Sequence, residues 1–189
     1  LLGTFDTEKL GFIIAPAVIV VIVIIIIMPL FLHGIDSGHE TVSLGKLAGG
    51  YEPATRNLTV EARGLFEQSV EETTTYKGST TKKLFVPLVP AAYRRGDKIT
   101  MVMQTPSLAE TQIVRLKQQA SFKGILRNVW WEGVDGDVVK YFKDDMSLPM
   151  ADDVKLLEYN ADSGQDLMIS IVVTASTVVI MGIILLILY

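Results

Sequence analysis

Two long apolar runs, one near each end of the chain, dominate the pattern of hydrophobic and polar positions. Residues 11–32 and 167–189 contain no Asp, Glu, Lys or Arg. A helix over the 22 residues of the first run is about 33 Å long, which is enough to cross a hydrocarbon core of about 30 Å. Both runs are also longer than a buried strand, which has about eight residues. The pattern therefore predicts two transmembrane helices at these positions, connected as a hairpin.

Residues 33–166, between the two runs, are expected to form one domain outside the membrane, with residues 1–10 as an N-terminal segment on the opposite side. Five acidic residues crowd the approach to the second run: Asp152, Asp153, Glu158, Asp162 and Asp166. An anionic cytoplasmic leaflet repels such a segment. We therefore expect an integral two-pass membrane protein whose domain lies on the periplasmic, intermembrane-space or lumenal side. Its expected partners are the lipid bilayer and integral membrane protein subunits.

Within residues 33–166, shorter patterns predict both strands and helices. Strands are expected at 57–67, 80–89, 98–104, 121–129 and 154–159, and a short helix at 137–144. Pro87 cannot donate a ladder hydrogen bond, so it indicates an edge strand or a bulge. Ser107 and Glu110 match a capping box at the start of a further helix. These elements predict an α+β domain with a mainly antiparallel sheet, of which a small barrel is one form.

The second apolar run carries a stripe of small and hydroxyl residues that is typical of helix packing in a bilayer. Its members are spaced four, three and four residues apart, which places them on one helical face: Ser170, Thr174, Thr177 and Met181. We expect this face to contact a partner helix. The alternative is that the hydroxyl groups donate to carbonyl groups of their own helix, one turn earlier.

The rarity of histidine and the absence of cysteine restrict the chemistry available to the chain. Without Cys there is no thiol catalysis, no iron–sulfur ligation and no disulfide scaffold. The weak candidates for a metal site follow the first apolar run: His33, Asp36, His39 and Glu40. Gly34 and Gly38 oppose the helical spacing that would align them, so a polar, flexible segment is the alternative. The sequence has no nucleophile elbow and no phosphate-binding loop, so we expect no catalytic residue, no cofactor and no small-molecule substrate.

Charge is strongly segregated along the domain. Residues 77–127 hold ten basic and two acidic residues, a net charge of +8, whereas residues 128–166 hold three basic and ten acidic residues, a net charge of −7. Either the two segments pair internally, or the basic segment is a docking face for a partner. The formal charge of −4 for the whole chain and the expected location disfavour nucleic acid as that partner.

Two places are the expected points of partner docking. Residues 93–97 have the composition of a turn, where side chains point to solvent, so Arg94, Arg95 and the neighbouring Lys98 are expected to face a partner. Trp130 and Trp131 are adjacent, so on a strand they would face opposite sides. One of them would then be exposed as an interface anchor, the alternative being burial of both in the core.

The order of apolar run, β-rich domain and apolar run resembles the Surfeit-locus cytochrome oxidase assembly family. A glycine-containing strand, Phe122-Lys123-Gly124-Ile125-Leu126-Arg127, is similar to one in that family, whereas the family's Arg-Gly-Trp motif is not present. The resemblance implies an assembly or accessory role around a respiratory complex, and it assigns no functional residue. We therefore expect a non-catalytic accessory subunit or assembly factor of a larger membrane complex. The alternative is a membrane-anchored binding or sensor domain that acts alone.

Overall fold

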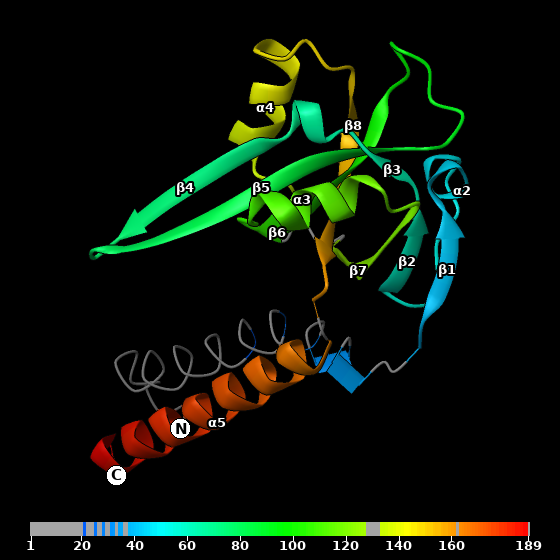
Figure 1. The fold of residues 1–189 in the computed structure, drawn as a ribbon. Coiled ribbons are helices and arrows are strands. Elements are labelled where there is room, and N and C mark those ends of the chain that lie inside the picture. The colour runs from blue at the N-terminus through cyan, green and yellow to red at the C-terminus, as the bar shows by residue number, and fades with distance from the viewer. Residues whose placement is uncertain are drawn as a thin grey trace, which may run out of the picture. The chain divides into compact units, whose positions relative to one another are not determined.

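The computed structural model describes residues 21, 25, 28, 31, 32, 34, 35, 38–127, 133–161 and 163–188 (Figure 1). The chain divides into two compact units. One unit comprises residues 1–37 and 163–189, and the other comprises residues 38–162. The second unit contains all the described strands and lies within the range 33–166, where the sequence predicts one domain.

The elements of this domain alternate between strands and short helices. In chain order they are β1 (Glu40–Ser43), α2 (Leu44–Ala48), β2 (Asn57–Glu61), β3 (Arg63–Gly64), the 3-10 turn η1 (Phe66–Gln68), β4 (Val70–Tyr76), β5 (Ser79–Val89), β6 (Ile99–Pro106), α3 (Glu110–Lys117), β7 (Ser121–Arg127), α4 (Gly136–Asp144) and β8 (Met150–Tyr159). The other unit contains α5 (Ser163–Leu188).

The strands form one eight-stranded sheet that curls into a barrel. Its order is β1-β2-β7-β8-β6-β5-β3, with β4 paired to β5. Only Ala62 separates β2 from β3, although the two strands lie near opposite ends of this order. The chain therefore closes the sheet on itself at Ala62, whose N–H group donates to the carbonyl oxygen of Ala120 at 3.0 Å.

The sheet is mixed, because two of its described pairings are parallel. β1 pairs with β2 in parallel, and β6 pairs with β8 in parallel, while the other described pairings are antiparallel. A parallel pair needs a long crossover, and α3, β7 and α4 provide it between β6 and β8. Pairing of this kind depends on contacts between distant segments, so local sequence patterns did not predict it.

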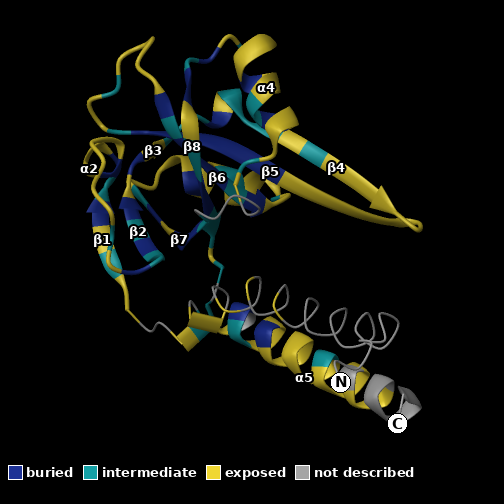
Figure 2. Cartoon of the chain, turned by 180° about the vertical axis from the view of Figure 1, so that it is seen from behind, coloured by how far each residue is buried: buried dark blue, intermediate teal, exposed yellow. Residues whose placement is uncertain are grey.

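Two clusters of buried side chains stabilise the domain. The first fills the barrel and contains Leu58, Val60, Leu84, Val86, Leu88, Met101, Met103, Phe122, Leu126 and Leu157, among others. The second lies on the outer face of β5, β6 and β8, where Val138 and Phe142 of α4 cover the sheet. The inner half of β5 and most of β6 are therefore buried on both faces, and Figure 2 shows the inner half of β5 dark blue.

Pro87 lies inside β5 at an interruption of the ladder. β3 pairs with β5 at Leu88 and Val89, and β4 pairs with it only from Phe85 outwards. Between these two strands the chain leaves the ladder through η1. The missing N–H group of Pro87 therefore deprives no neighbouring strand of a donor. The carbonyl oxygen of Pro87 accepts a hydrogen bond from Leu65 N at 2.9 Å.

Gly124 lies where β7 and β8 approach each other most closely. A Cβ atom at this position would collide with the backbone of Glu158 and lie 3.2 Å from the Cα atom of Tyr159. The adjacent Phe122 stacks edge-on against the Tyr159 ring, with ring centroids 6.4 Å apart. Glycine is required here because backbone atoms of β8 occupy the space that a Cβ atom would need. A backbone cannot change rotamer to make room, as a side chain can.

The helix predicted from Pro106 begins later than the sequence suggested. α3 starts at Glu110, and the side-chain oxygen of Gln112 accepts from Ala109 N at 3.0 Å. Ser107 does not cap this helix, because its hydroxyl group donates to Glu71 Oε2 at 2.6 Å. In α4 the cap is acidic, since Asp135 Oδ1 accepts from Asp137 N at 2.8 Å.

The expectation of a two-pass membrane hairpin is wrong. Among the residues that the structure describes, no helix has both the length and the apolar character needed to cross a membrane. The predicted helix at 11–32 lies mostly outside the described residues. The expected integral membrane location, with the domain on a periplasmic, intermembrane-space or lumenal side, has no support once the spans are withdrawn.

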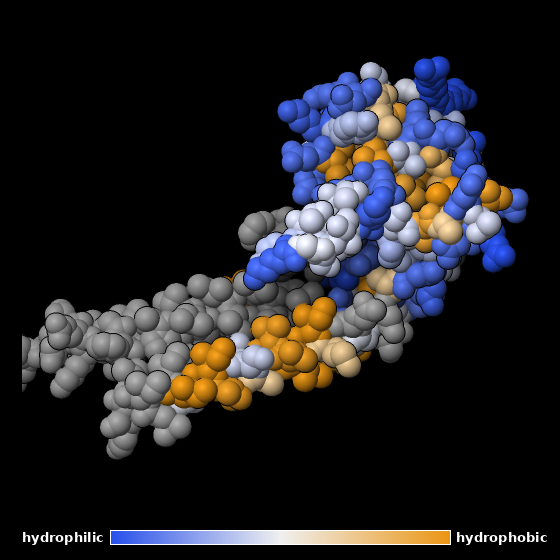
Figure 3. Space-filling model, turned by 60° about the vertical axis from the view of Figure 1, so that its left-hand side comes forward, coloured by the Kyte–Doolittle hydropathy of each residue, from blue (hydrophilic) through white to orange (hydrophobic). Residues whose placement is uncertain are grey.

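The composition of the second run misled because an apolar run is not specific to membranes. A helix that is apolar all round is also found inside large proteins. α5 begins four residues before the predicted run, with a polar first turn that includes Ser163 and Asp166. Its described side chains include many exposed apolar ones, which appear orange along the helix in Figure 3.

Candidate docking surface

The best-defined exposed feature of the domain is the loop between β5 and β6, residues 90–98, which we call the basic loop. Tyr93 N donates to Pro90 O at 3.0 Å, and Arg94 N donates to Asp97 Oδ2 at 2.8 Å. Asp97 N donates back to Arg94 O at 3.0 Å, and Gly96 takes the positive φ of 105° that the turn requires. These hydrogen bonds, two between backbone groups and one to the Asp97 carboxylate, hold the loop in a fixed conformation.

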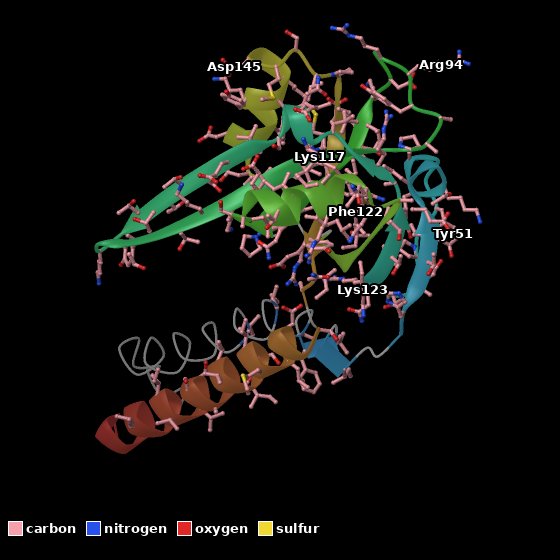
Figure 4. All side chains as sticks on the ribbon, viewed as in Figure 1. Tyr51, Arg94, Lys117, Phe122, Lys123 and Asp145 are labelled. Atoms are coloured by element: carbon pink, nitrogen blue, oxygen red, sulfur yellow. The ribbon has the colours of Figure 1, made fainter. Side chains whose placement is uncertain are left out.

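The basic loop is anchored at one residue and exposes its cations. Tyr93 is half-buried against the outer core cluster, whereas Arg94, Arg95 and Lys98 are exposed. Figure 4 shows Arg94 pointing away from the barrel, on a part of the domain separate from Asp145 beside α4. Three positive charges thus project from a fixed turn, which is the arrangement expected of an electrostatic docking point.

The ion pairs of the domain leave this loop unneutralised. Within the described part of the chain, the ion pairs join Lys82 to Glu71, Lys117 to Glu67, Arg127 to Glu158 and Lys143 to Asp152. Among the described residues, the pair of Arg127 and Glu158 is the one ion pair that connects the basic segment 77–127 to the acidic segment 128–166. Internal pairing therefore accounts for a small part of the segregated charge, and the cations of the basic loop take no part in it.

A groove of about 560 Å³ adjoins the start of the basic loop. Small residues form much of its lining, and three charged side chains stand among them: Ser43, Gly45, Ala62, Ala91, Ala92 and Ala120 with Glu61, Arg63 and Lys117. Its walls come from four separated parts of the sequence, which explains why no local pattern predicted it. An extended chain segment fits a lining of small residues, because the backbone can approach closely.

A second hollow, of about 620 Å³, lies beside β1 and α2. Here the Tyr51 hydroxyl group donates to Glu40 Oε1 at 2.6 Å, and Ala54 N donates to Glu40 Oε2 at 3.2 Å. The hydrogen bond to Glu40 raises the pKa of the Tyr51 phenol above its ordinary value. Both oxygens of the carboxylate are thus engaged in holding the loop after α2.

The candidate metal ligands are not brought together in the described structure. His39 Nε2 lies 2.9 Å from Thr59 Oγ1, while Glu40 bonds to Tyr51. His33 and Asp36 lie outside the described residues. Among the residues that are described, no group of three or more potential ligands has the geometry to hold a metal ion.

The hydroxyl groups of the predicted helix-packing stripe donate to carbonyl groups of their own helix, which is the alternative that the sequence left open. The Ser170 hydroxyl group donates to Leu167 O at 2.7 Å, Thr174 donates to Ser170 O at 2.7 Å, and Thr177 donates to Val173 O at 2.8 Å. Ser170 is fully buried and Thr174 is exposed, and the side chain of Met181 lies outside the described residues. The hydroxyl donors are therefore used within α5.

A different residue marks a helix contact in this unit. A Cβ atom on Gly34 would lie 2.6 Å from the backbone of Leu167, in the first turns of α5. Close approach of two helices at a glycine is the contact that small residues permit. Trp130 and Trp131, the other expected contact residues, lie outside the described part of the chain.

Comparison with known proteins identifies no relative. No family model matches the chain, and neither a curated protein nor a solved structure is significantly similar to it. The resemblance to the Surfeit-locus family therefore stays a prediction, and the function is argued from the geometry alone.

Proposed function

We propose that the chain is a non-catalytic accessory subunit that docks onto an acidic surface of a larger protein assembly through the basic loop. The observation that carries this proposal is the geometry of the loop. Its conformation is fixed by two backbone hydrogen bonds and by one from Arg94 N to the Asp97 carboxylate. Its cations Arg94, Arg95 and Lys98 are exposed and outside the described ion pairs. A fixed turn loses little conformational entropy on binding, so its charges are available for recognition.

The adjoining groove supports a protein partner rather than a dissolved anion. A lining of small residues next to the cations suits an extended segment that carries Asp or Glu. The acidic segment 128–166 contributes other elements of the domain, among them β8, which carries Asp152, Asp153 and Glu158. The domain is therefore electrically asymmetric, which orients it as it approaches an oppositely charged surface.

Co-purification tests the proposal directly. The full chain, tagged and isolated under gentle conditions at low salt, should retain a partner in fixed stoichiometry. Reversal of two charges, Arg94→Glu with Arg95→Glu, should remove that partner while the melting temperature stays as it was. Added salt should have the same effect, since charges are screened over about 8 Å at physiological ionic strength.

A matched control separates the loop from the overall charge. Lys123→Glu with Lys140→Glu changes the net charge equally, at exposed positions on β7 and α4. This control should keep the partner. Equal loss from both variants, or retention in the Arg94 and Arg95 variant, would contradict docking through the basic loop.

A further inference from the structure

The hairpin of β4 and β5 extends beyond the barrel as an exposed two-stranded arm, residues 73–83 (Figure 1, Figure 2). Its turn is Lys77-Gly78, with φ angles of 48° and 82°, which is the geometry of a two-residue hairpin. Every residue of the arm is exposed, and Tyr76 near its tip retains 69% of its accessible surface. A two-stranded ribbon without a covered face is only marginally stable in water.

The outer edge of β4 has unused backbone groups. Among the described strands, β4 pairs only with β5. Ser107 N donates to Lys82 O at 3.0 Å, so the Lys82 carbonyl group faces away from β4. Thr73 lies opposite Lys82, and in an antiparallel ladder the bonding direction alternates from residue to residue. The backbone groups of Thr73 and Thr75 therefore point to the open edge.

This edge has only part of the usual protection against pairing. Natural edge strands are blunted by charged side chains, above all lysine, by proline or by a bulge, and β4 carries charge only at Glu71 and Glu72, in its first three residues. β4 reads Val-Glu-Glu-Thr-Thr-Thr-Tyr, with neither proline nor lysine, and its register with β5 is continuous from Val70 to Tyr76. Its three threonines favour extended backbone and suit cross-strand pairing.

We propose that the outer edge of β4 pairs antiparallel with β4 of a second copy of this chain, with the two-fold axis at Thr74. In this register Thr73 of one copy lies opposite Thr75 of the other, and Glu71 lies opposite Lys77. The charges on the strand and its turn are thereby complementary. A register centred on Glu72 would place two like charges opposite each other, which is unfavourable.

The pairing converts two marginal ribbons into one four-stranded sheet. An interface made by a single pair of strands is at the small end of the size range for specific contacts. We therefore expect a reversible dimer that dissociates on dilution. This surface is separate from the basic loop, so the proposal stands or falls independently of the proposed function.

Site-directed cross-linking of the full chain tests the register. The chain contains no cysteine, so Thr74→Cys introduces a single thiol at the proposed axis. Facing residues of a non-hydrogen-bonded antiparallel pair have Cα atoms about 4.5 Å apart, within the range that a disulfide spans. Mild oxidation should yield a disulfide-linked dimer, whereas the control Thr80→Cys, on the opposite edge of the same arm, should not.

Sedimentation over a range of concentrations supplies the second readout. Thr73→Pro removes an outward N–H group in both copies and should weaken dimerisation about tenfold or more, whereas Thr80→Pro should leave it unchanged. Lys77→Glu should also weaken the dimer, because it would place a carboxylate opposite Glu71. A chain that is monomeric at every concentration, equal cross-linking of the two cysteine variants, or a dimer indifferent to Thr73→Pro would overturn the proposal.

Discussion

The inner and outer halves of β5 belong to one strand but lie in opposite surroundings. Residues 84–89 are buried on both faces, between the barrel interior and α4. Residues 79–83 are exposed on both faces. Residues 79–82 pair with β4 alone, and Lys83 also pairs with Pro106, the last residue of β6. A change from Ser-Thr-Thr-Lys-Lys to Leu-Phe-Val-Pro-Leu-Val is enough to divide the strand.

The comparison separates what holds this domain together from what it offers to other molecules. Apolar burial contributes about 25 cal/mol per Å², and it is concentrated in the inner half of the strand and its neighbours. The arm and the basic loop add little apolar burial, yet they project ordered backbone and charge into solvent. Substitutions in the two regions should therefore affect different measurements.

The largest expected effect comes from the inner half. Leu88→Ala removes a fully buried side chain from the barrel interior and should lower the free energy of unfolding by about 2–5 kcal/mol. Thr81→Ala, in the outer half, should change it by no more than about 0.5 kcal/mol. Denaturant unfolding of both variants checks the contrast, which similar losses in the two would refute.

Close backbone packing is the next most sensitive feature. Gly124→Ala places a Cβ atom against the backbone of Glu158, and we expect a loss of about 1–3 kcal/mol because β7 and β8 must separate. Gly45→Ala is the matched control, since a Cβ atom there meets nothing within 4 Å. Thermal unfolding should show a lower melting temperature for the first variant alone.

A smaller effect is expected at the helix that covers the inner half of β5. Asp135→Ala removes the acceptor for Asp137 N at the start of α4, which should cost about 1 kcal/mol. Asp135→Asn keeps a capping oxygen and should recover most of the loss. Chemical denaturation distinguishes the two, and equal destabilisation would show that the cap is not the cause.

The smallest effect concerns the base of the arm. Hydrogen bonds from Lys82 and Ser107 hold the pKa of Glu71 below its ordinary value. A carboxylate with a lowered pKa stabilises the folded state above its unfolded pKa, and this contribution is lost as the pH falls through its folded pKa. Glu71→Gln should therefore lower the melting temperature slightly at neutral pH, with the difference vanishing in acid.

The sequence predicted the elements that alternate apolar and polar residues, and it missed those that do not. Strands β5, β6, β7 and β8 and helix α4 lie close to their expected positions. β4 carries polar residues on both sides, so no periodicity marks it as a strand. The closure of the barrel depends on a bend at Ala62, which no local pattern reveals.

The candidate docking surface likewise has one part that the sequence predicted and one part that it did not. The turn at Arg94 and Arg95 was predictable because Gly96 and Asp97 make it locally, whereas the adjoining groove is assembled from distant segments. The predicted membrane helices rested on composition alone, which does not identify the surroundings of an apolar helix. Contacts between distant segments therefore account for the parts of the structure that the sequence did not predict.

Amide hydrogen exchange along β5, in dilute solution, tests the central claim that one strand is divided between stability and recognition. The amides of residues 84–89, excluding Pro87, which has no N–H group, should exchange only when the whole domain unfolds, because they lie between two buried layers. Amides of residues 79–83 should exchange much faster, through local opening of the arm. Equal protection of the two halves would contradict the division.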